Sequence, residues 1–247
     1  MALSGGVDSA VVAAVARAAL GDDVLAATVV SSAVALSEVG AAREVAQRIG
    51  LRHRWVRAEP LDEPRYRENG PDRCYHCRRV ETGALRQLAE GAGVRQLLDG
   101  IQLNDLSDDR PGLRAMDEAG FTHPLLWAGW DKAAVRRYAR AVGLPNADRP
   151  SNACLASRVA RGQAISEELL GRIDRAEHLL TDRGFRRVRV RVQGTAARIE
   201  VDRSEVSRLE EPTFLQEVSL ELRAIGFTSV SVDPRGYLSQ ERLLTVR

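Results

Sequence analysis

A glycine-rich loop at residues 4–9, with the sequence SGGVDS, lies between a short apolar segment and an Ala-rich stretch that predicts a helix over 10–20. A loop that leads from a strand into a helix presents backbone N–H groups and the positive end of the helix dipole, which together bind anions. The loop at residues 4–9 therefore predicts a phosphate-binding α/β domain. Only residues 1–3 precede the loop, so we expect the first strand to be a stub or the start of the chain to be truncated.

The residue types of this loop suit a ligand with phosphate groups. Gly5 and Gly6 let the backbone approach a phosphate closely, and Ser4 and Ser9 add hydroxyl donors. Asp8 cannot bind phosphate directly, but its carboxylate suits a Mg²⁺ ion that bridges phosphate oxygens. The loop lacks the Gly-Lys-Ser ending of a Walker loop, so it is not a loop of that type. The alternative is a plain glycine turn before a helix.

Strand-like and helix-like segments alternate after the loop. Short apolar or alternating runs predict strands, at 24–30, 51–57 and 94–98. Further helices are expected, at 38–49, 82–92 and 132–142. Ser37 is the expected N-cap of the first of these, and Gly50 lies just past its end. This order predicts an α/β fold with a Rossmann-like parallel sheet and helices on both faces.

The pattern changes after residue 150. Ser166 is expected to cap a helix that runs to about residue 183. Two alternating strands, a helix and a strand follow, at 187–192, 197–201, 216–224 and 228–233. We therefore expect two domains: a phosphate-loop domain over 1–150, and a small α+β domain over 151–247. The expected boundary lies near residues 145–165.

Composition excludes several classes of protein. No apolar run in the 247 residues reaches the roughly 18 residues that a membrane helix needs. The chain does not open with a basic segment followed by an apolar one, so we expect a cytoplasmic protein without a membrane partner. The net charge of only +2 argues against nucleic acid as a partner. Lys132 is the only lysine among 36 basic residues, so a phosphate clamp would depend on arginine, backbone N–H groups or metal. The sequence leaves a homo-oligomer open.

The chain holds three cysteines, Cys74 and Cys77 in a C-x-x-C and Cys154 far along the chain. This odd number argues against a disulfide framework. Three thiols can ligate three irons of a [4Fe–4S] cluster and leave the fourth iron open. The same thiols could hold zinc with His76 or His53 as the fourth ligand. The third interpretation is a single reactive Cys154 with no metal.

Charged side chains mark two further candidate sites. Arg110 and Arg114 could clamp pyrophosphate, or lie on the surface. Arg189 and Arg191 share one strand face with Arg187, and such a stripe is either solvated or binds an anion such as the phosphate of a mononucleotide. Glu177, on the preceding helix, could pair with this stripe.

The loop SGGVDS resembles the signature of the PP-loop ATP pyrophosphatases, which cleave ATP to AMP and pyrophosphate. The segments at 99–106 and 110–114, PSNACLASR at 150–158 and ARIEV at 197–201 narrow the resemblance to the LarE family of sulfur transferases, over nearly the whole chain. The resemblance implies that the chain adenylates carboxylates of pyridinium-3,5-biscarboxylic acid mononucleotide and converts them to thiocarboxylates. It makes this small-molecule nucleotide and a sulfur donor the expected partners.

The resemblance also implies roles for the cysteines. In one group of the family, the cysteine matching Cys154 gives up its own sulfur and becomes dehydroalanine. In another group, three cysteines hold an iron–sulfur cluster that carries the sulfur, and Cys74, Cys77 and Cys154 resemble that group. Asp8 and Cys154 are then the expected catalytic residues. ATP would lie on the loop with Arg110 and Arg114, and Glu177, Arg189 and Arg191 would bind substrate.

The C-terminal end departs from the family pattern. Members commonly end in Tyr-Arg-x-Gly-Ser, whereas here Tyr237 is followed by Leu238 and the glycine is missing. If the missing arginine binds a substrate phosphate elsewhere in the family, Arg235 or Arg242 must replace it here.

Two rival functions stay open. A tRNA thiolation enzyme also combines a PP-loop with C-x-x-C and a distant cysteine, but it predicts a basic RNA-binding surface. A nucleotide-binding sensor without chemistry predicts three cysteines with no shared role.

Overall fold

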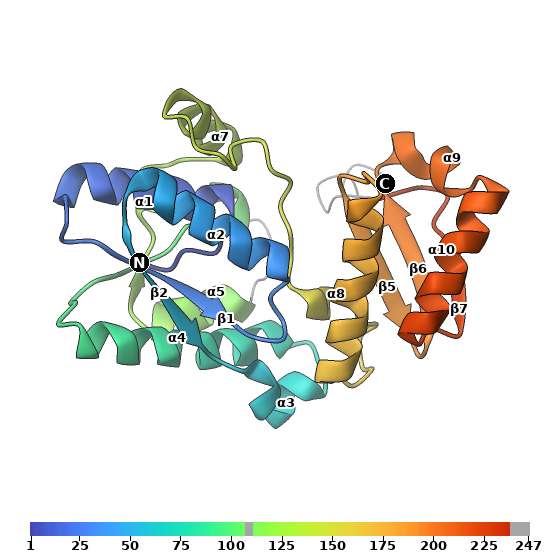
Figure 1. Ribbon diagram of the computed structural model, residues 1–247. Coiled ribbons are helices and arrows are strands. Elements are labelled where there is room, and N and C mark those ends of the chain that lie inside the picture. The colour runs from blue at the N-terminus through green and yellow to red at the C-terminus, as the bar shows by residue number, and fades with distance from the viewer. Residues whose placement is uncertain (107–110, 238–247) are drawn as a thin grey trace. The chain divides into compact units, whose positions relative to one another are not determined.

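The computed structural model describes residues 1–106 and 111–237, and the chain forms two compact units, Met1–Cys154 and Leu155–Arg247 (Figure 1). The first unit is a parallel α/β unit. Its strands are β1 (Leu25–Val30), β2 (Arg52–Arg57), β3 (Leu97–Leu98) and β4 (Phe121–Thr122). Its helices are α1 (Val7–Leu20), α2 (Leu36–Ile49), α3 (Pro64–Arg67), α4 (Arg73–Gly91), α5 (Pro111–Glu118), α6 (Pro124–Trp127) and α7 (Lys132–Ala141).

Residues 1–3 occupy the centre of the sheet in the first unit. The Leu3 N–H donates to Ala27 O in β1 (2.8 Å), and the Ala2 N–H donates to Leu98 O in β3 (2.8 Å). β1 pairs with β2 and β3 pairs with β4, both in parallel. Counted in chain order from residues 1–3, the spatial order is 3-2-1-4-5, which is the Rossmann arrangement. The order of the strands reverses between residues 1–3 and β3, and ligands bind at that switch point in open α/β sheets.

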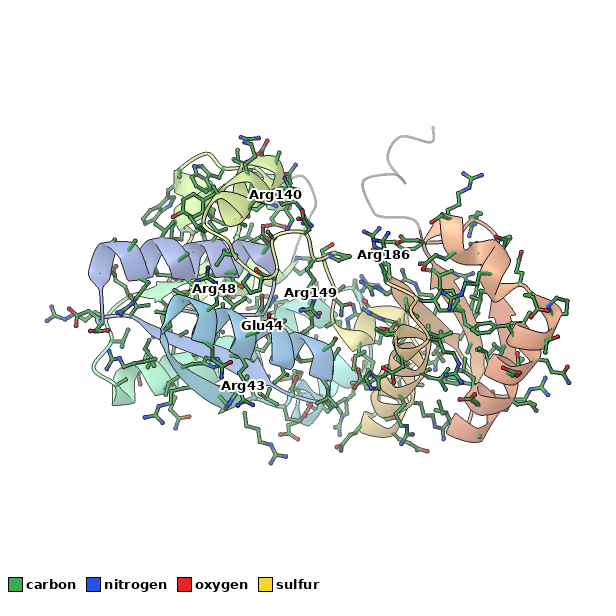
Figure 2. The ribbon with its side chains drawn as sticks, turned by 45° about the horizontal axis from the view of Figure 1, so that its top comes forward. Arg43, Glu44, Arg48, Arg140, Arg149 and Arg186 are labelled. Carbon is green, nitrogen blue, oxygen red and sulfur yellow. The ribbon has the colours of Figure 1, made fainter. Side chains whose placement is uncertain are left out.

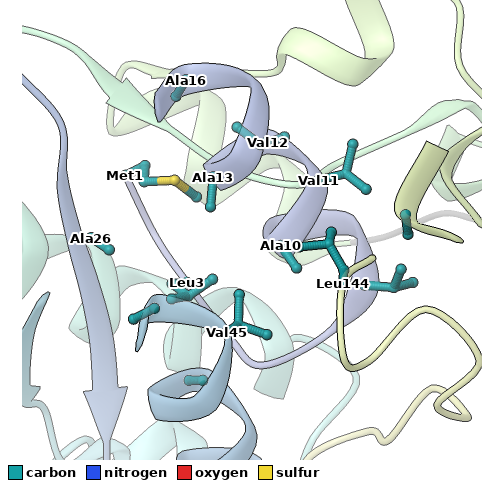
Figure 3. Packing of buried hydrophobic residues seen from close by; sticks show 14 of the residues in the cluster. Met1, Leu3, Ala10, Val11, Val12, Ala13, Ala16, Ala26, Val45 and Leu144 are labelled. Carbon is teal, nitrogen blue, oxygen red and sulfur yellow. The ribbon is translucent and has the colours of Figure 1, made fainter. Parts of the chain in front are cut away.

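The first turns of helix α1 are buried and fix the loop that precedes them. Ala10, Val11, Val12 and Ala13 are all buried, and they pack with Leu3 and side chains of α2 and α7 (Figure 3). A run of consecutive buried apolar residues places this part of the helix in the core. The loop that enters it is therefore anchored at both ends by buried structure.

Two local predictions for the first unit are wrong. α2 begins at Leu36 with Ala35 as its N-cap, so Ser37 lies inside the first turn and does not cap it. The carboxylate of Glu38 in that turn favours the helix end through the helix dipole. α4 begins at Arg73, nine residues before the expected start at 82, because its first turns are too polar to show an apolar period. Cys74 and Cys77 consequently lie one turn apart on a helix.

The second unit contains a three-stranded sheet that α8 (Glu167–Asp182) and α10 (Pro212–Ile225) cover on one face. β5 (Val188–Gln193) pairs with β6 (Ala196–Val201) antiparallel, and β6 pairs with β7 (Ser229–Val232) in parallel. A short helix, α9 (Val206–Leu209), follows β6. Ser166 caps α8 by accepting from the Leu169 N–H (3.2 Å), as expected. The mixed α/β fold with a parallel sheet and covering helices is confirmed. None of the helices in residues 1–106 and 111–237 has the length and apolarity to span a membrane.

Candidate active site

The loop 4–9 holds its shape through its own serines. Ser9 Oγ donates to Gly6 O (3.0 Å) and accepts from the Ser4 N–H (3.1 Å). Ser9 is buried, whereas Ser4 is exposed. The Ser9 hydroxyl is thus engaged within the loop, and the Ser4 hydroxyl, 3.1 Å from Ser9 Oγ, lies at the surface where a ligand can reach it.

Glycine at positions 5 and 6 of the loop is explained by different physical constraints. Gly5 has φ +81°, and a Cβ there would lie 2.6 Å from Glu38 O, so both conformation and packing require glycine. A Cβ on Gly6 would meet only Ser4 Oγ, at an ordinary 3.4 Å. Packing within the chain therefore does not require glycine at position 6, which is consistent with close approach of a ligand there.

Asp8, in the first turn of α1, forms an ion pair with Lys132. Lys132 Nζ lies 2.5 Å from Asp8 Oδ2. In the described part of the chain, Asp8 Oδ1 is buried without a hydrogen-bond partner. Asp131 caps α7 by accepting from the Ala134 N–H (2.7 Å), and the Lys132 N–H donates to Asn104 Oδ1 (2.9 Å), so the lysine is held at the start of its helix. The open carboxylate oxygen fits a hard cation such as Mg²⁺.

Arg149 and Glu38 form a second charged pair at the same site. Arg149, labelled in Figure 2, has its Nη2 2.7 Å from Glu38 Oε1, at the first turn of α2. Asn152 Nδ2 donates to the same oxygen (2.9 Å). Arg149 Nη1 is buried with no hydrogen-bond partner among the described residues, so it offers a donor to an anion.

These groups line one cavity of about 410 Å³ within the first unit. Its wall contains the loop from Ser4 to Asp8, both cations Lys132 and Arg149, and the segment from Pro150 to Cys154. The volume falls in the range of small-molecule sites. Cys154 thus shares a cavity with the phosphate loop, although the two lie far apart in sequence.

The three cysteines are reduced thiols, each half-buried. Cys77 Sγ donates to Glu81 Oε1 (3.5 Å), and Arg78 Nη1 donates to Glu81 Oε2 (2.7 Å). Burial raises the pKa of the Cys77 thiol well above its ordinary value, and the carboxylate of Glu81 adds to the increase.

Tyr66 is fully buried in the first unit, and its hydroxyl has no hydrogen-bond partner in the described residues. Burial raises the pKa of this phenol, and the charges of Cys77 and Cys154 raise it further.

The zinc interpretation of the cysteines finds no matching geometry. Over residues 1–106 and 111–237, no three His, Cys, Asp or Glu side chains converge to hold one metal ion. His53 Nε2 lies 2.8 Å from Thr28 Oγ1 in the neighbouring strand, and burial lowers its pKa. A four-iron cluster makes a different demand, because each cysteine binds a separate iron and the sulfurs need not meet at one point.

Asp99 lies buried at the switch point. Its carboxylate contacts His123 Nδ1 (2.8 Å) and accepts from the Ile101 N–H (3.0 Å). Burial raises the pKa of Asp99. These contacts give Asp99 a role in positioning the strand end beneath the loop.

The structure places Arg114 outside the cavity wall. Its guanidinium stacks over the Tyr75 ring, 4.2 Å from the centroid, and Arg114 Nε lies 3.6 Å from Glu118 Oε1. Arg110, the other expected pyrophosphate clamp, lies outside the described residues, as do Leu238 and Arg242.

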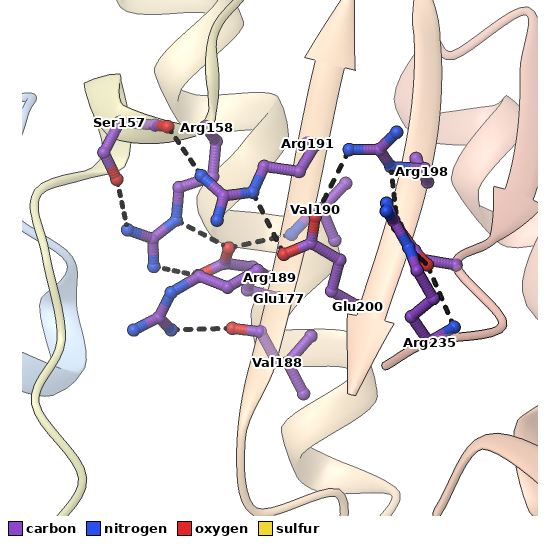
Figure 4. A network of polar contacts seen from close by, with 11 residues as sticks. Ser157, Arg158, Glu177, Val188, Arg189, Val190, Arg191, Arg198, Glu200 and Arg235 are labelled. Atoms are coloured by element: carbon purple, nitrogen blue, oxygen red, sulfur yellow. Dashed lines mark hydrogen bonds and ion pairs between the residues drawn. The ribbon is translucent and has the colours of Figure 1, made fainter. Parts of the chain in front are cut away.

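In the second unit, Glu177 pairs with a buried arginine. Arg158 Nε lies 2.8 Å from Glu177 Oε1, and Arg158 Nη2 lies 2.9 Å from Glu177 Oε2 (Figure 4). The Val190 N–H also donates to Glu177 Oε1 (2.9 Å). Glu177 thereby joins the end of the PSNACLASR motif to β5.

On the face of the second sheet opposite α8 and α10, several arginines surround one carboxylate. Arg191 Nε lies 3.1 Å from Glu200 Oε2, and Arg198 Nη2 lies 3.4 Å from Glu200 Oε1 (Figure 4). Arg189 lies opposite Glu200 on β6 and is buried, which lowers its pKa. Arg235 binds Asp233 (3.0 Å) and lines the same cavity as Arg191 and Arg198. Positive charge exceeds negative charge on this face, as a site for an anion requires.

Comparison with known proteins assigns the chain to a family. The family model described as asparagine synthase matches residues 1–68, which include the loop. An uncharacterized protein of Synechocystis is 37% identical over 99% of this chain and 92% of its own length. The pyridinium-3,5-bisthiocarboxylic acid mononucleotide synthase of Lactiplantibacillus plantarum is 31% identical over 97% of this chain and 86% of its own length. The chain belongs to the LarE family. As a LarE-type protein it is an ATP-dependent sulfurtransferase of cofactor biosynthesis, with a PP-loop ATP pyrophosphatase domain.

Sequence reasoning did not include two residues of this LarE-type site among its candidates. Lys132 is the only lysine of the chain, and this feature of the sequence could have marked it as a candidate site residue. Arg149 directly precedes the PSNACLASR motif, but only the structure shows its open donor beside the loop.

Proposed function

We propose that the protein adenylates carboxylates of pyridinium-3,5-biscarboxylic acid mononucleotide and converts them to thiocarboxylates. The observation that carries the proposal is that Cys154 and the loop from Ser4 to Asp8 line one cavity. An enzyme that activates a carboxylate with ATP and then delivers sulfur needs both groups within reach of one carbon atom. The L. plantarum synthase, whose name states the bisthiocarboxylic product, supports this choice of substrate.

The first half-reaction uses the loop. A carboxylate oxygen of the substrate bonds to the α-phosphorus of ATP, and the bond from that phosphorus to the bridging oxygen breaks. The electron pair leaves with pyrophosphate. Asp8 would hold the Mg²⁺ that accompanies ATP, since its Oδ1 is without another partner among the described residues. Backbone N–H groups of the loop and the open Nη1 of Arg149 would stabilise the charge on the departing pyrophosphate.

The second half-reaction delivers sulfur to the acyl carbon, and AMP leaves with the electrons of the carbon–oxygen bond. The donor set of three thiols outside any disulfide fits a [4Fe–4S] cluster held by Cys74, Cys77 and Cys154. Such a cluster would supply a sulfide donor and spare the sulfur of Cys154. Without it, Cys154 would lose its own sulfur and become dehydroalanine.

The arginine-rich face of the second unit is proposed to hold the phosphate of the mononucleotide. Arg189 and Arg191 would carry that contact, with Glu177 holding Arg158 and β5 in position. Arginine suits phosphate because its planar fork donates two parallel hydrogen bonds.

Substrate-dependent release of pyrophosphate tests the function. The protein is incubated with MgATP and the pyridinium biscarboxylate mononucleotide, with unmodified tRNA, or with neither. Pyrophosphate and AMP formed only with the pyridinium compound support the proposal. Turnover only with tRNA supports the thiolation rival, and ATP binding with no turnover supports the sensor.

Iron content tests the cluster separately. Anaerobically reconstituted protein is expected to hold about four irons per chain and to lose most of them in Cys74→Ala, Cys77→Ala and Cys154→Ala. If wild type holds no iron and Cys74→Ala transfers sulfur as well as wild type, the cluster assignment is wrong and Cys154 is the sacrificial donor.

A further inference from the structure

The single lysine of the chain lies in the ATP cavity. Every other basic residue is arginine, and the exception contacts the carboxylate proposed to hold Mg²⁺. Lys132 Nζ lies 2.5 Å from Asp8 Oδ2, and both side chains are about a quarter exposed. Two further cations on the cavity wall are paired with carboxylates, Arg149 with Glu38 and Arg78 with Glu81.

The geometry of the pair explains why lysine suits this position. An ammonium group is a compact charge, and here it engages one oxygen of Asp8 and leaves Oδ1 without a partner among the described residues. A guanidinium in the same place would present two parallel donors and tend to occupy both carboxylate oxygens. Lysine therefore neutralises Asp8 while keeping one oxygen open to a cation.

We propose that Lys132 is a catalytic residue. It is paired with Asp8 in the free protein and binds the phosphates when MgATP is bound. The inference rests on the proposed use of MgATP at this site. Asp8 would hold the Mg²⁺ that accompanies ATP, and the Lys132 ammonium would then bind the β- and γ-phosphate oxygens.

The exchange keeps the charges of the site balanced. With MgATP bound, Asp8 would hold the cation and Lys132 would bind the phosphates, so each charged side chain would keep a partner. As the α-phosphorus bonds to the substrate carboxylate and pyrophosphate departs with the electron pair, negative charge grows on the leaving group. Lys132 stabilises that charge more in the transition state than in bound ATP.

Two substitutions separate this role from a merely structural one. Lys132→Met is expected to lower kcat for pyrophosphate release about 100-fold without raising the Mg²⁺ concentration that gives half-maximal rate. Lys132→Arg keeps the charge but is expected to raise that Mg²⁺ concentration about tenfold, because its fork competes for both oxygens of Asp8. Arg137→Met, an exposed position on the same helix, is the matched control and is expected to behave as wild type.

Chemical labelling provides a readout that does not depend on turnover or on variants that fold. The wild-type protein is treated with acetic anhydride, and the acetylated peptide that contains Lys132 is measured by mass spectrometry. MgATP and Mg-pyrophosphate are each expected to slow acetylation of Lys132 about tenfold, through contact with the phosphates.

Either of two results overturns the proposal: acetylation that MgATP leaves unchanged, or pyrophosphate release by Lys132→Met at the wild-type rate. Protection of Lys132 in a protein that forms no thiocarboxylate would instead sustain the role of Lys132 and contradict the proposed substrate. The two failures are thus distinguishable.

Discussion

Gly100 packs so closely on Ser9 that a Cβ at position 100 would lie 2.5 Å from the Ser9 backbone nitrogen. Gly100 follows β3 and Ser9 lies in the first turn of α1, so this contact brings together the two sides of the switch point. The lack of a side chain at position 100 is what lets the phosphate loop lie against the neighbouring strand end.

Gly100→Ala is expected to destabilise the protein by about 1–3 kcal/mol and to weaken ATP binding, because the backbone of the loop must move to admit the methyl group. Urea unfolding and ATP titration calorimetry measure the two effects. Gly83→Ala is the control, since Gly83 lies inside α4 and a methyl group there would meet nothing within 4 Å. Helix propensity makes that change neutral or stabilising by up to about 1 kcal/mol. Equal stability and ATP affinity in Gly100→Ala and wild type would refute the packing argument.

Asp8→Asn is expected to lower pyrophosphate release at least about 100-fold while the fold stays intact. The amide keeps the shape of the side chain but loses the charge that holds Mg²⁺. Pyrophosphate release and the circular dichroism melting curve are compared with those of Asp22→Asn, an exposed position after α1. A near wild-type rate for Asp8→Asn would mean that Mg²⁺ is held elsewhere.

Much of the fold could be predicted from local sequence, because buried strands and helices have apolar patterns that short windows reveal. The run 24–30 contains β1, and Ser166 caps α8 as its position before two glutamates indicates. The start of α4 escaped prediction because Arg73 and Glu81 lie on its buried side and break the apolar period. Buried charged residues of this kind depend on partners that are distant in sequence.

In the candidate site, too, some features could be predicted from local sequence and others depend on residues that are distant along the chain. The loop 4–9 is visible in sequence because its chemistry is contained in six consecutive residues. The contact of Asp8 with Lys132 joins residues 124 positions apart, and no local pattern predicts it. The open donor of Arg149 likewise depends on where Glu38 places its carboxylate.

Glu177→Gln is expected to destabilise the protein by about 3–5 kcal/mol, because it leaves the fully buried charge of Arg158 without its carboxylate. Chemical unfolding measures the change. Glu168→Gln on the same helix is the control: its partner Arg172 is surface-accessible and the carboxylate is largely exposed, so the expected cost is below about 1 kcal/mol. Similar costs for both substitutions would show that the Arg158 pair contributes no more than a surface pair.

Asp233 is expected to make the stability of the protein depend on acid pH. Hydrogen bonds from the Arg235 side chain hold the pKa of Asp233 below its ordinary value of 3.8. Its contribution to stability is therefore present above that ordinary value and is lost as pH falls through the lower pKa of the folded state. Unfolding free energies of wild type and Asp233→Asn, measured from about pH 6 down to about pH 3, should converge at the acid end. Curves that stay parallel over this range would contradict the assignment.

The mass of the nucleotide product after reaction tests the central claim most directly. The anaerobic protein is given MgATP, a sulfide source and pyridinium-3,5-biscarboxylic acid mononucleotide, and the nucleotide is analysed by mass spectrometry. The account predicts a product in which sulfur has replaced one oxygen of a carboxylate, formed together with equal amounts of AMP and pyrophosphate. Consumption of ATP with an unchanged nucleotide, or sulfur incorporated into tRNA instead, would contradict it.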